Sequence, residues 1–239
     1  MLTKYTKPAI TILMLSSYAL FAHLAFADSK TKVSTGYFYS EGQDNTSGNP
    51  KSTLNAVPFM ASYKASKVSA SLSTSYISST YGSTTNSGMG DTTVSLSYDL
   101  TEQPWVTLKG KYKFATGDVN KGLSTGKDDV SLQFDLFQPT TKTTSVFATV
   151  GYKFVGKVSG KSMQDTAYAS IGGGYLPMPG LSLGASLDYR QATYTTLDDQ
   201  IGASLFLDKK LTSKLHTAVF GGYDNTDTAS IGITFSYQL

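Results

Sequence analysis

The sequence predicts an all-β chain that closes as a transmembrane, antiparallel, up-and-down β-barrel of about 12 strands. Three observations favour this fold class. Apolar side chains recur at every second position through most of the 239 residues, no segment has the period of a helix, and the chain ends on an alternating apolar stripe. Such alternation sends successive side chains to opposite faces of a sheet, so one face can meet lipid and the other an enclosed interior.

The N-terminal residues 1–27 predict a secretory signal peptide that is cleaved on export. Lys4 and Lys7 precede an apolar run over residues 9–26, and an A-x-A cleavage site ends at Ala27. The run is a poor candidate for a membrane-spanning anchor, because polar residues interrupt it and a spanning helix needs about 20 mostly apolar residues.

The mature domain, residues 28–239, has the composition of an exported barrel. The chain has no cysteine, which excludes a lipoprotein anchor, a disulfide framework and a thiolate metal site. Charged residues make up 15% of the chain, below the roughly 25% of ordinary soluble proteins. Cleavage removes two of the 20 basic residues and none of the 17 acidic ones, and this near balance predicts no nucleic-acid partner. We also predict no bound cofactor.

The alternating segments can be followed in order along the mature chain. Pro58 lies inside the second of them, and we expect a β-bulge there because proline has no N–H to donate to a strand ladder. The expected strands span residues 33–39, 57–63, 68–76, 94–98, 106–114, 130–136, 146–154, 167–175, 181–189, 201–207, 215–223 and 231–239.

The connections between these strands alternate between long and short. Those after odd strands are mostly long and polar, at residues 41–52, 79–90, 115–127, 156–165 and 191–199, with a short one at 224–227. Those after even strands are short, at residues 64–67, 101–104, 138–142, 177–180 and 208–214. Long outer loops that alternate with short periplasmic turns are expected of a bacterial outer-membrane barrel. A soluble two-sheet sandwich would also alternate, but it does not require this asymmetry.

Tyrosines gather near both ends of the expected strands, as they do where the apolar band of a membrane protein meets water. The lower set is Tyr63, Tyr98, Tyr175 and Tyr237, and the upper set is Tyr76, Tyr112, Tyr152, Tyr189 and Tyr223. The sequence therefore predicts two aromatic girdles.

The last ten residues resemble the C-terminal signal strand of bacterial outer-membrane barrels, although that pattern usually closes on Phe or Trp. The resemblance implies recognition by the barrel assembly machinery, and we expect this strand to pair with residues 33–39 and close the barrel. Its apolar face is formed by Ile231, Ile233, Phe235, Tyr237 and Leu239.

The opposite set of side chains would line the interior, where many are Ser or Gly and a few are charged. Lys109, Lys111 and Lys113 form a ladder on one strand, and we expect them opposite Asp135, Gln133 and Ser131 in that order. Asp188 and Arg190 also point inward. One interpretation is a stripe that selects anions or the carboxylate of an aromatic acid, and the other is an interior filled by salt-bridged polar side chains. The candidate selectivity residues are Lys109, Lys111, Lys113, Asp135, Asp188 and Arg190.

The residues needed for catalysis are scarce. His216 is the one histidine that survives cleavage. A triad needs a nucleophile within hydrogen-bond reach of the histidine and a third group that orients it, and neither can be assigned. We therefore predict no enzymatic activity. Acidic pairs such as Asp128 with Asp129 are interpreted as solvated loop charge rather than as a metal site.

Five segments together resemble the outer-membrane barrel family linked to the meta-cleavage pathway of phenol degradation, whose members are described as transporters. These are GMGDTTVSLSY at 88–98, LKGKYKFATGD at 108–118, GLSTGKDDV at 122–130, VGYKFVG at 150–156 and LSLGASLDY at 181–189. The resemblance implies transport of phenol or another aromatic compound.

The sequence thus predicts a porin-like channel of a Gram-negative outer membrane, in contact with membrane lipid, that passes small solutes passively, with aromatic or anionic ones as candidates. The alternatives are a lipid-modifying enzyme and a structural or adhesive barrel that acts through its extracellular loops.

Overall fold

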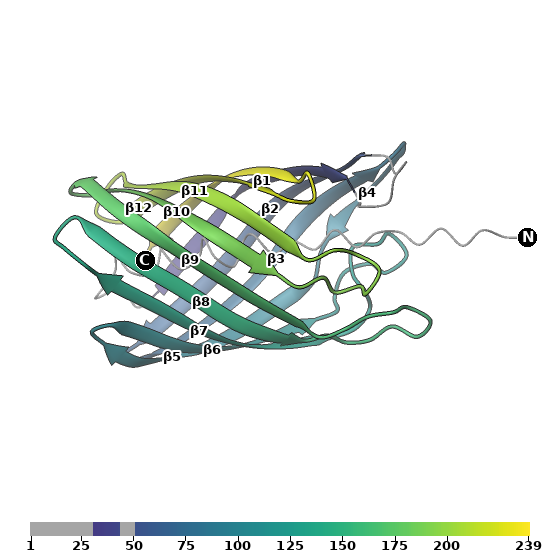
Figure 1. The fold of residues 1–239 in the computed structure, drawn as a ribbon, viewed down its shortest axis with the longest axis horizontal. Helices are drawn as coiled ribbons and strands as arrows, with labels where there is room; N and C mark the ends of the chain where they lie inside the picture. The colour runs from purple at the N-terminus through teal and green to yellow at the C-terminus, as the bar shows by residue number, and fades with distance from the viewer. Residues whose placement is uncertain (1–30, 44–50) are drawn as a thin grey trace, which may run out of the picture.

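The computed structural model describes residues 31–43 and 51–239, so the predicted signal peptide lies outside the described residues (Figure 1). The described chain is built of antiparallel strands, and no helix in it is long and apolar enough to cross a membrane. The strands are β1 Thr31–Gln43, β2 Lys51–Ala65, β3 Val68–Tyr81, β4 Thr84–Met89, β5 Thr92–Glu102, β6 Trp105–Phe114, β7 Asp129–Pro139, β8 Thr144–Phe154, β9 Thr166–Met178, β10 Leu181–Arg190, β11 Gln200–Lys210, β12 Leu215–Asp224 and β13 Ala229–Gln238.

The last strand closes the barrel against the first, as the sequence predicts. Val33 lies opposite Tyr237 and Tyr39 lies opposite Ile231 in the β1–β13 ladder, while the other edge of β1 pairs with β2. Apart from β4, which pairs only with β3, each remaining strand pairs with a neighbour on both sides, so the sheet has no long free edge. Closure satisfies the backbone N–H and C=O groups inside the sheet, which a span through lipid requires.

Strands β4 and β5 together occupy one position in a barrel of 12. The first half of β3, from Val68 to Ser73, pairs with β5. Its second half, from Tyr76 to Tyr81, pairs with the short extra strand β4. The prediction of a loop over residues 79–90 is therefore wrong in most of that range. Threonine suits the strand here, because Thr80 and Thr85 lie opposite each other with their hydroxyl oxygens 2.9 Å apart.

The two classes of connection gather at opposite ends of the barrel (Figure 1). Short turns and the C-terminus lie at the left end of the view, and the longer loops lie at the right end with β4. These longer loops include residues 115–128, 155–165 and 191–199. The expected asymmetry is thus confirmed for the described loops, apart from the β3–β4 turn. Of the expected loop over residues 41–52, residues 44–50 lie outside the described residues, and the rest belong to β1 and β2.

The two faces of the sheet differ as predicted. Side chains of one parity are exposed and apolar, from Val33 on β1 to Tyr237 on β13, and both sets of tyrosines are exposed at the ends of this band. Side chains of the other parity point inward, and many are buried even though the wall is one sheet thick. The exposed apolar face is what lipid would cover.

The expected bulge at Pro58 is absent. Thr35 pairs with Phe59 and Phe38 pairs with Ala56, which is the same register on both sides of the proline. The ladder instead lacks the two residue pairs between them, as expected where a strand lacks one donor. The β2–β3 ladder runs through Pro58 without a break.

Candidate functional site

An apolar path crosses the interior obliquely, from the short-turn end to the long-loop end. It starts at Trp105, the first residue of β6, whose ring centroid lies 6.1 Å from that of Phe137. Phe137 lies opposite Phe147 in the β7–β8 ladder. The path then follows strand pairs and ring contacts through Phe206, Phe220, Phe38 and Ala56 to Ile77, beside β4. Most of its members belong to one cluster of buried hydrophobic residues.

The phenylalanine rings of this path lie flat against the wall because glycines face them. A Cβ added at Gly172, Gly184 or Gly232 would overlap the ring of Phe147, Phe206 or Phe220, respectively. Phe147 on β8 and Phe206 on β11 thereby reach toward each other over two glycine strands, and their ring centroids are 6.0 Å apart. The glycines keep these rings from projecting toward the centre of the barrel.

The lysine ladder lies on the wall opposite the middle of this path. Going from β6 to β12 takes six steps through β7 to β11, and six through β5, β3, β2, β1 and β13. Lys111 is in the middle of β6, and Phe220 is in the middle of β12. The interior therefore has a cationic wall facing an aromatic wall.

The predicted register of the ladder is wrong by two residues. Lys113 lies opposite Asp129, Lys111 opposite Ser131 and Lys109 opposite Gln133. The loop that joins β6 to β7 is centred one residue earlier than expected, because Asp129 is the first residue of β7 and points inward. A change of one residue in the loop centre moves every pair by two.

Asp135 is the centre of a buried network next to Lys109. The ammonium of Lys109 lies 3.1 Å from Asp135 Oδ2, while Thr149 and the amide of Gln133 donate hydrogen bonds to Asp135 Oδ1 at 2.9 and 2.5 Å. Gln133, which is 1% exposed, in turn accepts a hydrogen bond from Tyr168 at 3.0 Å. The predicted pair of Lys109 and Asp135 is thus present, although diagonally.

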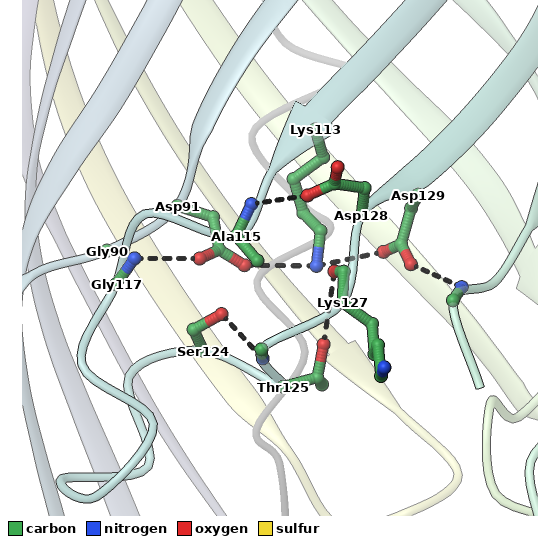
Figure 2. A network of polar contacts seen from close by, with 12 residues as sticks. Gly90, Asp91, Lys113, Ala115, Gly117, Ser124, Thr125, Lys127, Asp128 and Asp129 are labelled. Atoms are coloured by element: carbon green, nitrogen blue, oxygen red, sulfur yellow. Dashed lines mark hydrogen bonds and ion pairs between the residues drawn. The ribbon is translucent and has the colours of Figure 1, made fainter. Parts of the chain in front are cut away.

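Lys113 joins the strands at the outer end of the interior, as Figure 2 shows. Its ammonium lies 3.0 Å from Asp91 and 3.1 Å from Asp129. Asp91 also accepts a hydrogen bond from the N–H of Gly117, and Asp129 accepts one from the N–H of Gly156. One lysine thus connects the bases of the loops at 115–128 and 155–165.

The outer loops are also fastened on the lipid-facing side. The N–H of Ala115 donates to Asp128 at 2.9 Å and the hydroxyl of Tyr112 donates at 2.8 Å. These hydrogen bonds, the backbone one first, lower the pKa of the exposed Asp128 carboxyl. Asp128 and Asp129 are therefore not the solvated pair that the sequence suggested. Asp128 anchors the loop, and Asp129 is buried in the interior.

The remaining predicted residues lie apart from the ladder's ion pairs. Asp188 accepts hydrogen bonds from Ser186 and Ser204, with the shortest at 2.8 Å. Arg190 lies opposite Tyr168 in the β9–β10 ladder. The Lys111 ammonium stands 5.9 Å from the centroid of the Tyr168 ring. The structure thus brings Lys111 and Arg190 to the same tyrosine, and leaves Asp188 with serines.

His216 points inward near the short-turn end and is 3% exposed. Its Nδ1 lies 3.6 Å from Asp208, and Ser236 is its partner in the β12–β13 ladder. A lipid substrate would have to reach a covered side chain on the inner face of the wall, so this position does not favour a lipid-acting enzyme. Within residues 31–43 and 51–239, no group of three His, Cys, Asp or Glu side chains could hold a metal ion.

The sequence did not identify Tyr168 and Asp91 as members of the interior networks, and it did not show the apolar path. It placed Gln133 in the interior, but opposite Lys111 rather than Lys109. Strand parity does place Phe147 and Phe220 inward once the outward sets are assigned. It does not show that the rings join across glycines, because that depends on the register of neighbouring strands. Asp91 directly follows the predicted loop over residues 79–90 and lies at the break between β4 and β5.

Comparison with known proteins shows the fold. No family model matches the chain, and no curated protein matches it. Among solved structures, the chain is similar to an outer-membrane channel from Pseudomonas putida F1, with 16% identity, a TM-score of 0.69, and coverage of 88% of this chain and 96% of that one. It is also similar to the translocator domain of the autotransporter NalP from Neisseria meningitidis, with 12% identity, a TM-score of 0.64, and coverage of 94% of each chain. A third similar structure is the CymD monoaromatic hydrocarbon channel, with 12% identity, a TM-score of 0.55, and coverage of 98% of this chain and 95% of that one. The chain therefore has the fold of outer-membrane β-barrels.

Proposed function

We propose that this chain is an outer-membrane channel that passes small solutes by diffusion, with aromatic and anionic solutes as its candidates. The observation that carries the proposal is that the apolar path lies across the interior from the lysine ladder. A solute ring can exchange contacts along a continuous apolar surface while its charged group faces lysines. The likeness to the CymD monoaromatic hydrocarbon channel supports the aromatic half of the proposal. Fold alone does not decide function, since an autotransporter domain shares it.

The selectivity residues in this proposal are Lys109, Lys111, Lys113, Asp135, Asp188 and Arg190. The ion pairs divide their roles. Lys109 and Lys113 hold carboxylates in place, so their charge is compensated. Lys111 then supplies positive charge that a passing anion meets, and Arg190 lies on the strand next to Tyr168, over whose ring the Lys111 ammonium stands.

Reconstituted liposomes test the proposal directly. The mature chain should pass arabinose in a swelling assay and should pass benzenesulfonate faster than methanesulfonate, because the aromatic wall gives the larger anion an additional contact. Sulfonates keep their charge and do not cross lipid readily, so leakage through the bilayer is a small background. A folded barrel that passes none of the three solutes would show that the proposal is wrong.

Export is the second part of the proposal. We propose that residues 1–27 are removed and that residues 28–239 reside in the outer membrane, where Ile231, Ile233, Phe235, Tyr237 and Leu239 serve recognition by the assembly machinery. Intact mass measured on outer-membrane fractions should correspond to a chain that starts at Asp28. A protein that retains Met1 would contradict the cleavage.

A further inference from the structure

We infer that the interior holds a binding site for a small organic oxyanion, formed by Lys111 and Lys153 beside Tyr168 and Arg190. The inference deepens the proposed function, because it places one stopping point on the route of an anionic solute. Lys153 was not among the residues that the sequence singled out. The ligand class is a carboxylate or sulfonate, the groups that ammonium and guanidinium donors bind by charge-assisted hydrogen bonds.

The strand register brings these four residues together. Lys111 lies opposite Ser131, and Ser131 lies opposite Lys153, so the two lysines flank one small side chain on β7. Two residues along the strands, Gly151 lies opposite Tyr168 and Tyr168 lies opposite Arg190. Adjacent strands are about 4.8 Å apart and inward neighbours about 7 Å apart, so Lys153 and Arg190 lie on the two strands that flank Tyr168, while the Lys111 ammonium stands 5.9 Å from its ring centroid.

Neither of the two lysines forms a direct ion pair with an acidic side chain of the described residues. Among the residues that the structure describes, no carboxylate oxygen lies within ion-pair distance of Lys111 or Lys153, whereas Lys109 on one side of Lys111 has one such partner and Lys113 on the other side has two. Bringing cations together without a counter-charge raises the free energy of the folded barrel. An anion bound between them would lower it.

Tyr168 gives the site a fixed floor. Its ring crosses the wall from β9 over Gly151, where a Cβ would overlap it, and its hydroxyl donates to Gln133 on β7. Gln133 is held in turn by Asp135 at 2.5 Å. Lys111 stands over this ring, so the ammonium is directed by an aromatic face rather than by a carboxylate. The arrangement leaves its N–H donors available to an anion.

Calorimetry on the full mature chain in detergent tests the site with benzenesulfonate as the probe. Lys111→Met with Lys153→Met should weaken binding by about tenfold or more, the loss expected when charge-assisted hydrogen bonds are removed. Lys64→Met with Lys142→Met is the matched control, because it removes the same charge at the short-turn end, where Lys64 pairs with Asp99. That control should bind as the unmodified chain does.

Unchanged affinity in the Lys111 and Lys153 variant, or no binding to the unmodified chain, would overturn the inference. If the methionine variant does not fold, Lys111→Gln with Lys153→Gln keeps the positions polar and serves the same purpose. Binding in detergent does not depend on flux. A barrel that passes solutes without binding benzenesulfonate refutes the site alone, and one that binds without passing solutes refutes the channel.

Discussion

Tyr112 donates its hydroxyl hydrogen to Asp128 across the base of an outer loop, at an oxygen–oxygen distance of 2.8 Å. The loop over residues 191–199 repeats the arrangement. Tyr189 donates to Asp199 at 2.7 Å, and the N–H of Ala192 donates to the other oxygen of the same carboxylate. In both loops a tyrosine of the upper girdle and a backbone N–H three residues later share one aspartate. The girdle therefore also anchors the loops.

Acid should release the first of these anchors. The lowered pKa of Asp128 means that the folded loop favours the carboxylate, so its contribution to stability is present above the ordinary aspartate pKa of about 3.9 and is lost as the pH falls through the lowered value. Pepsin cleavage within residues 115–128 should rise in that range. In Asp128→Ala the cleavage should be high already at pH 4, whereas Lys127→Ala should behave as the unmodified chain. A pH-independent rate in the unmodified chain would contradict the role of Asp128.

The glycines under the aromatic path should tolerate no side chain. Gly184→Ala forces the Phe206 ring from the wall and should destabilise the barrel by about 1–3 kcal/mol, the usual cost of overpacking. The measurement is the thermal unfolding midpoint in detergent. Adding Phe206→Leu should recover part of the loss. Gly173→Ala is the control, since a Cβ there meets its nearest neighbour at an ordinary 3.6 Å; equal destabilisation by the two alanines would argue against the ring contact.

Removing Lys113 should loosen the outer loops. Lys113→Met leaves Asp91 and Asp129 near each other without their shared cation, and the rate of trypsin cleavage at Lys121 and Lys127 should rise about tenfold. Lys157→Met removes an exposed contact of 3.9 Å to Asp165 and should change little. The same cleavage rate in both variants would mean that Lys113 does not hold the loops.

Loss of the chain end should prevent assembly. Deletion of residues 235–239 removes the partners of Val33 and Thr35 on β1 and of Leu215 and Thr217 on β12, so the barrel cannot close at the short-turn end. The product should lack the heat-modifiable gel band of a folded barrel. Leu239→Phe should insert normally, because Leu239 is exposed at the end of the same apolar face. Normal insertion of the truncated chain would contradict closure by β13.

The strands were predictable because alternation is a local signal. Lipid on one side and the interior on the other impose a period of two, and residues 231–239 and their partners on β1 followed from it. The prediction of a loop over residues 79–90 was wrong because Ser and Thr carry no apolar alternation. They nevertheless pair well across strands once Gly82 turns the chain. The prediction of a β-bulge at Pro58 was wrong for a different reason, since the loss of one N–H donor does not require an extra residue in the strand.

The interior was less predictable because its contacts join distant strands. The sequence identified Lys109 and Asp135 as neighbours. It could not show that Lys111 and Lys153 lack an ion pair, because the choice of carboxylates that reach Lys109 and Lys113 depends on the register of β6 against β7, which the loop between them sets. Tyr168 comes from β9, and no pattern within one strand shows that its hydroxyl ends at Gln133 on β7.

The fastening of the loop over residues 155–165 at its base makes its tip available for engineering. The N–H of Val155 donates to Asp165 and that of Gly156 to Asp129, so both hydrogen bonds hold the loop where it leaves the wall. At the tip, Gly160 has no heavy atom within 4 Å of where a Cβ would be. In the proposed outer-membrane location with the long loops outside, a foreign epitope inserted after Gly160 would be displayed on the cell surface while the anchoring hydrogen bonds, and the interior behind them, remain in place.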